Sequence, residues 1–138
     1  MARKRAVIFL RSPARGTRFW LADYLPALDP TEKMAAIAAT IERKLAPVTA
    51  VSVLLPHDCV DGVFTAFWAR PEMYLDADVR RNISNFVLAP ADYVAEGLAR
   101  LEVDLRSGEW DRRYGHLRSL PELDLGHRLL VAELEVAR

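Results

Sequence analysis

The sequence contains a single cysteine, Cys59, and three histidines among its 138 residues. One cysteine cannot form a disulfide within the chain, and one cysteine with three scattered histidines does not give the ligand spacing of a zinc site. We therefore expect no disulfide and no metal. This cysteine usage is typical of a reducing compartment.

Long hydrophobic runs are also absent. No segment approaches the roughly 20 apolar residues of a membrane-spanning helix, and the run at residues 6–10 is too short for the core of a signal peptide. We expect a soluble cytoplasmic protein with no membrane partner.

The chain has no excess of charge of either sign, with 19 Lys and Arg against 19 Asp and Glu. No net field attracts nucleic acid, so we expect no nucleic-acid partner. Basic residues nevertheless crowd the start, and a solvated face explains them better than a phosphate or RNA contact. They are Arg3, Lys4, Arg5, Arg11, Arg15 and Arg18.

Three apolar runs predict strands. Residues 5–11 are β-branched and aromatic and end at Ser12-Pro13, which predicts a buried strand. Residues 48–55 predict a second strand that is buried on at least one face, and residues 127–136 predict a third.

The segment "LDPTEKMAAIAATIERKLAP" predicts an amphipathic helix. Asp29 is the expected N-cap, Pro30 suits the first helical position, and Pro47 ends the run. The apolar side chains recur at the 3, 4 and 7 spacing of one helical face. They are Met34, Ile37, Ala38, Ile41 and Leu45.

Four further helices are predicted between the second and third strands, at about residues 62–68, 76–86, 90–105 and 109–120. The order is therefore strand, helix, strand, helical block, strand. It predicts an α/β fold with a small mixed three-stranded sheet, whose first two strands are parallel through a right-handed crossover. Such a sheet leaves an edge exposed unless another chain covers it.

The stretches "FWLADYLPAL", "HDCVDGVFTAFWARPEMYLDADVR" and "LPELDLGHRLLVAEL", in this order of elements, resemble the C-terminal part of class I S-adenosylmethionine-dependent methyltransferases of the type 11 sort. The resemblance implies a partial Rossmann-like fold in which an antiparallel last strand lies between the two others. It implies one half-domain over residues 1–138, with a helical cap insertion at about residues 59–122 that covers the substrate.

The chain departs from that family in its glycines. The family binds its cofactor with a glycine-rich loop after a strand, whereas the six glycines here lie at positions 16, 62, 97, 108, 115 and 126, far apart. The cofactor-binding residues are unknown, and S-adenosylmethionine is expected only if a partner chain supplies its binding half. The chain is then a subunit of a split enzyme, a stand-alone half with another task, or a remnant.

The run His57, Asp58, Cys59 follows the second strand, where ligands gather in open α/β sheets. A base and a thiolate nucleophile are one interpretation. Adjacent residues of an extended chain point to opposite sides, so a turn between strand and helical block is the favoured one, with Asp58 or Asp61 as a helix N-cap.

Aromatic residues are dense, and a core explains them better than a pocket wall. They are Trp20, Tyr24, Phe64, Phe67, Trp68 and Tyr74. Arg70, with Arg80 and Arg81, could clamp a carboxylate or phosphate, although surface arginines are more often solvated. In residues 107–116 a helix packed by Trp110 is favoured, with Tyr114 and His116 as pocket residues if it lies over the site.

We therefore expect a methyltransferase-like half-domain that binds a small-molecule substrate and supports methyl transfer only with a partner chain. His57 or Tyr114 is the expected catalytic base. The expected substrate-binding residues are Trp20, Tyr24, Asp58, Phe67, Trp68, Arg70, Tyr74 and His116. The alternative is a non-enzymatic homodimer or small-ligand-binding module. In either case the edge of residues 5–11 predicts a homo-oligomer or a partner subunit.

Overall fold

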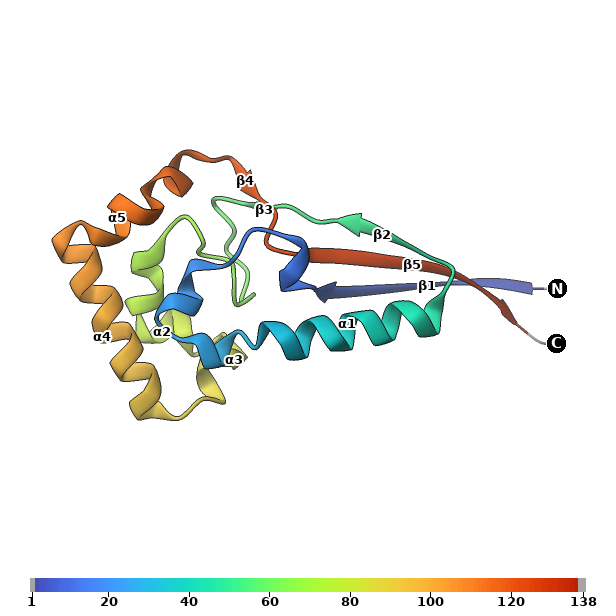
Figure 1. Cartoon of the computed structure of the whole chain (residues 1–138), viewed down its shortest axis with the longest axis horizontal. Coiled ribbons are helices and arrows are strands. Elements are labelled where there is room, and N and C mark those ends of the chain that lie inside the picture. The colour runs from blue at the N-terminus through green and yellow to red at the C-terminus, as the bar shows by residue number, and fades with distance from the viewer. Residues whose placement is uncertain (1, 137–138) are drawn as a thin grey trace. The chain divides into compact units, whose positions relative to one another are not determined.

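The computed structural model describes residues 2–136, which divide into two compact units (Figure 1). The sheet unit consists of the chain up to Arg18, Pro30–Leu54 and the chain from Asp124 onwards. The helical unit consists of Phe19–Asp29 and Leu55–Leu123, and so holds the predicted cap together with a segment from before the first predicted helix. The single half-domain over the whole chain stays a prediction.

Three strands form the sheet: β1 (Ala2–Arg11), β2 (Val48–Ser52) and β5 (His127–Val136), in the order β1-β5-β2. β5 is antiparallel to both neighbours, with Leu129 opposite Phe9 on one side and Val51 on the other. β1 and β2 are therefore parallel to each other and are connected through α1 (Thr31–Leu45). This confirms the predicted strand directions and the position of the last strand between the other two.

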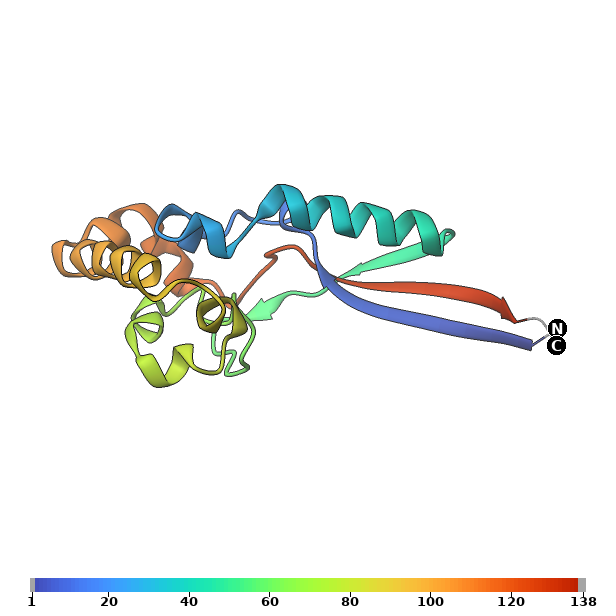
Figure 2. The same ribbon diagram turned by 90° about the horizontal axis from the view of Figure 1, so that it is seen from below.

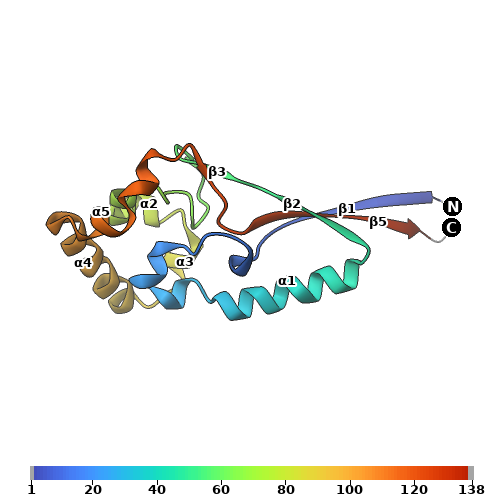
Figure 3. The ribbon, with the colours of Figure 1, turned by 45° about the horizontal axis from the view of Figure 1, so that its top comes forward.

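Only one face of the sheet is covered within its unit. α1 runs along the strands (Figures 2 and 3), and Leu130 and Ala132 on β5 are fully buried. On the alternate positions, Val7 is 56% and Phe9 is 51% exposed. The prediction that residues 5–11 form a buried strand is therefore wrong, because side chains of a strand alternate between faces and α1 can cover only one.

The second predicted strand is also corrected. β2 ends at Ser52, and of its five residues only Val48 is even partly buried, so the expected burial of one face is wrong. Leu55–Pro56 instead form β3, which pairs antiparallel with β4 (Glu122–Leu123) inside the helical unit. The predicted strand at residues 48–55 is therefore two strands, separated by a break at residues 53–54.

The start of α1 differs from the predicted one. Pro30, with ψ at 80°, is the N-cap rather than the first helical residue, so Asp29 lies one position before the cap. The first helical bond runs from the Met34 amide to the Pro30 carbonyl at 3.0 Å. Ile37, expected on the buried face, is 51% exposed, whereas its neighbour Ala38 is buried.

The helical unit is made of short elements around one long helix. In chain order they are η2 (Trp20–Asp23), η3 (Pro26–Leu28), η4 (Pro71–Leu75), α2 (Ala77–Arg80), α3 (Ser84–Val87), α4 (Ala91–Ser107), α5 (Glu109–Tyr114) and η5 (Gly115–Ser119). The predicted helix at residues 62–68 is a series of turns, and the one at 76–86 is split because Ile83 is extended. Among the described residues, no helix is long and apolar enough to cross a membrane.

Aromatic rings form the core of the helical unit, as the sequence analysis favoured. Trp20, Trp68, Trp110 and Tyr74 are fully buried, and the rings of Trp20 and Trp110 meet edge to face at 5.2 Å. The indole N–H of Trp20 donates to the Trp68 carbonyl at 2.9 Å, and the Tyr74 hydroxyl donates to a backbone carbonyl of the same unit. The polar tips of Trp20 and Tyr74 are thus hydrogen-bonded inside the unit, whereas the buried indole N–H groups of Trp68 and Trp110 have no hydrogen-bond partner among the described residues.

The segment after β1 crosses the segment before β5 at very short range. The Ser12 amide donates to the Gly126 carbonyl at 2.8 Å, and a Cβ at Gly16 or Gly126 would strike the opposing backbone. Gly126 also has a φ of 93°, which disfavours any side chain. Beside the crossing, the Arg128 guanidinium donates to the Asp124 carboxylate at 2.8 Å and lowers the pKa of that carboxyl.

We expect Gly126→Ala to lower the free energy of unfolding by about 2 kcal/mol or more, because it adds both a clash and a strained φ. Gly115→Ala is the matched control, since Gly115 has an ordinary helical φ of −58° and a Cβ there meets only a side chain at 3.4 Å. Urea denaturation of both variants measures the difference. Equal losses would show that the crossing does not constrain the fold.

His127, the first residue of β5, is buried and stacks on the Phe9 ring, with centroids 5.4 Å apart. Burial, followed by the charge of the nearby Arg11 guanidinium, lowers the pKa of His127 to about 4, although the Asp124 carboxylate acts in the opposite direction. The folded protein therefore holds this imidazole neutral at pH 7.

Because the unfolded chain protonates His127 near pH 6.5 and the folded chain only near pH 4, the free energy of unfolding should fall as the pH drops between these values, by up to about 3 kcal/mol. His127→Gln should flatten this dependence, and His116→Gln, at an exposed position, should not. Urea unfolding at pH 7 and pH 4.5 gives the comparison. A slope unchanged by His127→Gln would contradict the assignment.

Candidate functional site

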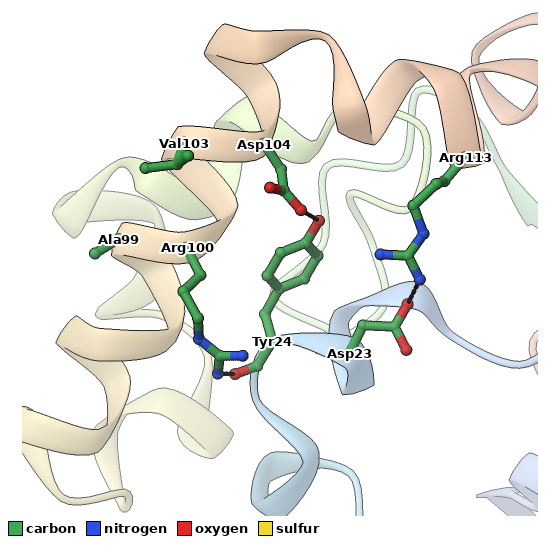
Figure 4. A pocket seen from close by; sticks show the side chains of 7 residues that line it. All are labelled: Asp23, Tyr24, Ala99, Arg100, Val103, Asp104 and Arg113. Carbon is green, nitrogen blue, oxygen red and sulfur yellow. Dashed lines mark hydrogen bonds and ion pairs between the residues drawn. The ribbon is translucent and has the colours of Figure 1, made fainter.

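A pocket of about 380 Å³ opens in the helical unit (Figure 4). One lining residue comes from η2 and one directly follows it, four come from α4, and one comes from α5. The lining residues are Asp23, Tyr24, Ala99, Arg100, Val103, Asp104 and Arg113. Two carboxylates, two guanidiniums and a phenol thus surround one small cavity.

Tyr24 lies at the centre of this group, with its ring buried against Trp20. Its hydroxyl donates to the Asp104 carboxylate, with 2.6 Å between the oxygens. Burial, and then this hydrogen bond and the negative charge of Asp104, raise the pKa of Tyr24 above its ordinary value. Tyr24 is therefore a neutral hydrogen-bond donor and not a base at physiological pH.

Gly97 lets α4 approach the Tyr24 segment closely. A Cβ at position 97 would lie 2.7 Å from the Tyr24 carbonyl oxygen and would strike the Leu25 side chain. One turn further along the helix, the Arg100 guanidinium donates to the same carbonyl at 2.6 Å. Gly97 therefore allows the close approach of α4 to the Tyr24 segment, and the hydrogen bond from Arg100 holds it there.

Asp23 ties α5 to the other side of the pocket. Its carboxylate accepts from Arg113 at 2.9 Å and from the Tyr114 hydroxyl. Arg113 also donates to the Tyr114 hydroxyl at 3.0 Å, and its guanidinium lies over the Tyr114 ring. Tyr114, an expected base, therefore lies beside the pocket with its hydroxyl hydrogen-bonded to a carboxylate.

His57, the other expected base, lies elsewhere in the unit. His57 and Asp58 are exposed in the turn after β3, where the His57 amide donates to the Pro121 carbonyl at 3.0 Å. The Cys59 amide closes this turn onto the Pro56 carbonyl at 3.2 Å. The run is thus a turn at a strand end, as favoured, but turns rather than a helix follow it, so the expected capping of a helix by Asp58 or Asp61 is wrong.

The other expected substrate-binding residues lie apart from this pocket. Trp20, Phe67, Trp68 and Tyr74 are buried in the aromatic core, and His116 is exposed on η5. Arg70 donates to the Cys59 carbonyl and lies over the Phe67 ring. Tyr24 is thus the one expected substrate-binding residue that lines this pocket, and the roles of the rest stay predictions.

The two arginines considered with Arg70 have partners inside the protein. Arg80 donates to the Tyr74 carbonyl at 2.8 Å, and Arg81 forms an exposed ion pair with Asp78. Among the described residues, no group of three or more His, Cys, Asp or Glu side chains is placed to hold a metal ion.

Most of the pocket was missed from sequence. Tyr24 and Asp104 are 80 residues apart, and Asp23 and Arg113 are 90 apart, so neither pairing has a local signal. The spacing of Arg100 and Asp104 on one helix is visible, because residues four apart share a face. It indicates a polar stripe without indicating what the stripe contacts.

We expect Tyr24→Phe to lower the free energy of unfolding by about 1–2 kcal/mol, because it removes the donor to a partly buried carboxylate. Asp104→Asn should cost less, since its amide oxygen can still accept from the Tyr24 hydroxyl. Urea denaturation at pH 7 compares them. An equal or larger loss in Asp104→Asn would mean that the charge of Asp104, rather than this hydrogen bond, stabilises the pocket.

Comparison with known proteins gives one structural relationship. No protein-family model matches the sequence, and no curated protein matches it. A solved structure from Anabaena variabilis ATCC 29413, described as a candidate methyltransferase from an antibiotic biosynthesis pathway, is 39% identical with a TM-score of 0.81. The match covers 94% of this chain and 55% of that chain.

The fold of this chain is therefore methyltransferase-related: a mixed α/β structure with small sheets. The chain spans about half the length of the protein that it resembles. The type 11 and half-domain assignments stay predictions.

The methyl donor that such a fold implies is S-adenosylmethionine, and the described residues do not fit it. A nucleotide-binding turn of this class needs clustered glycines that let the backbone approach the ligand. The two glycines with positive φ are Gly108, between α4 and α5, and Gly126, before β5. Neither belongs to a strand, glycine loop and helix in succession, so we derive no step through this cofactor.

Proposed function

We propose that this chain is the substrate-holding component of a cytoplasmic S-adenosylmethionine-dependent methyltransferase and that a second polypeptide supplies the cofactor site. The observation that carries the proposal is the match to the Anabaena protein, which is 39% identical over 94% of this chain yet leaves much of the longer chain unmatched. A chain that corresponds to part of such a protein needs the rest of it for catalysis.

The sheet order supports a partial Rossmann-like methyltransferase fold. An antiparallel strand between two parallel ones, β1-β5-β2, is the arrangement that the sequence resemblance implied for the last three strands. The helical block follows β2 in sequence, where the resemblance places a substrate cap. The proposal therefore puts the small-molecule substrate in the helical unit.

Within that unit, the pocket beside Tyr24 is the proposed substrate site. The neutral Tyr24 hydroxyl and the Arg100 and Arg113 guanidiniums can donate hydrogen bonds there, and the Asp23 and Asp104 carboxylates can accept them. This donor and acceptor set suits a polar molecule rather than a hydrocarbon. Tyr114 and His57 stay the two candidate bases, and Tyr114 is the one beside the pocket.

We expect titration calorimetry of S-adenosylmethionine into the purified protein alone to show no saturable heat up to about 1 mM. The reason is the lack of a glycine-rich nucleotide turn in the described residues. The intact Anabaena protein is the control for the ligand and the conditions. Micromolar binding by this chain alone would overturn the proposal that a second polypeptide supplies the cofactor site.

A further inference from the structure

The sheet unit presents an uncovered apolar face. It is opposite α1, and its strand register places the following side chains together: Val7, Phe9, Val51, Leu129 and Val131. We call these five the open face. Val7, Phe9 and Val51 are 56%, 51% and 45% exposed, and the two β5 residues between them are half-buried. Grouped apolar side chains on a protein surface are typical of an interaction site.

The same strand that carries Val7 and Phe9 is also an open edge. β1 is ten residues long and pairs only with β5 among the described residues, so its outer backbone groups have no strand beside them. A long exposed edge is a template for another strand, and natural proteins blunt or cover such edges. The open face and the open edge meet along β1, so one partner can cover both.

Charge argues against a second copy of this chain as that partner. Arg3, Lys4 and Arg5 lie at one end of β1 and Arg11 at the other, and among them Arg5 has Glu133 opposite it on β5. Antiparallel pairing of two β1 strands centred on Val7 would set Arg3 opposite Arg11. Like charges directly opposite destabilise a strand pair, so an acidic strand is the better occupant.

We infer that the open face and the β1 edge bind the polypeptide that corresponds to the unmatched part of the Anabaena protein. This identity of the partner rests on the proposed function. That protein shares the sheet at 39% identity and has further chain available to cover it. The partner adds a strand to β1, places apolar side chains on Val7 and Phe9, and carries acidic groups facing Arg3 and Lys4.

The experiment uses the whole chain, co-expressed with the unmatched part of the Anabaena protein as a separate tagged polypeptide. We expect a one-to-one complex by size exclusion with light scattering, and a complex that weakens with added salt. Val7→Asp should raise the dissociation constant at least tenfold, because it buries a charge in the interface. Leu88→Asp is the matched control, since Leu88 is 85% exposed in the helical unit and should leave binding unchanged.

Both substitutions are at exposed positions, and circular dichroism with urea unfolding checks that each variant folds. A complex equally sensitive to both substitutions, or to neither, overturns the inference, and so does the lack of any complex. A stable dimer of this chain that Val7→Asp dissociates would overturn it in favour of a second copy.

Calorimetry with S-adenosylmethionine on the purified complex separates this inference from the proposed function. If a complex forms that is sensitive to Val7→Asp but does not bind the cofactor, the docking surface stands and the proposed function fails. If the complex binds the cofactor and is insensitive to Val7→Asp, the proposed function stands and this docking surface fails.

Discussion

The backbone crossing between Gly16 and Gly126 is the constraint on which the sheet unit depends. The Thr17 amide donates to the Asp124 carbonyl at 2.7 Å, and the Arg128 side chain reaches the Arg15 carbonyl at 3.2 Å. These bonds bring the end of β1 to the start of β5, from which the two strands pair along their whole length. β5 then occupies the centre of the sheet, and β2 can pair only on its far side.

This arrangement has a cost in burial. With β5 central and α1 as the covering helix of the sheet unit, Leu130 and Ala132 in one row are buried, whereas Val7 and Phe9 in the alternate row are about half exposed. Leaving Val7 and Phe9 half in water forgoes roughly 1–2 kcal/mol of hydrophobic stabilisation for each side chain. The helical unit buries three tryptophans fully, although it also leaves Val60, Val87, Leu88 and Val103 exposed. What distinguishes the sheet unit is that its exposed Val7, Phe9 and Val51 share one face of the sheet.

The elements with strong local patterns were predicted from sequence. The apolar runs of β1 and β5, the 3, 4 and 7 spacing of α1 and the length of α4 all depend on neighbours in the chain. Burial was predicted less well, because the apolar residues of β1 are the same whether one face or both are covered. The prediction of one strand at residues 48–55 was wrong for a related reason. β2 and β3 both continue one apolar run, but they pair with different strands, which the sequence pattern does not indicate.

In the candidate site, too, features that depend on local sequence were predicted and features that depend on the tertiary fold were not. The aromatic core could be predicted from the sequence, because a chain with so many aromatic residues, among them Trp20, Trp68 and Tyr74, buries most of them in a core. The polar pocket could not, because Tyr24 meets Asp104, and Asp23 meets Arg113, only through the tertiary fold. The core in turn explains why the pocket is ordered. Trp20 and Trp110 pack against each other, Trp20 contacts the pocket residue Tyr24, and Trp110 contacts Tyr114 beside the pocket. Packing within the aromatic core therefore orders a polar pocket whose pairing partners lie far apart in the sequence.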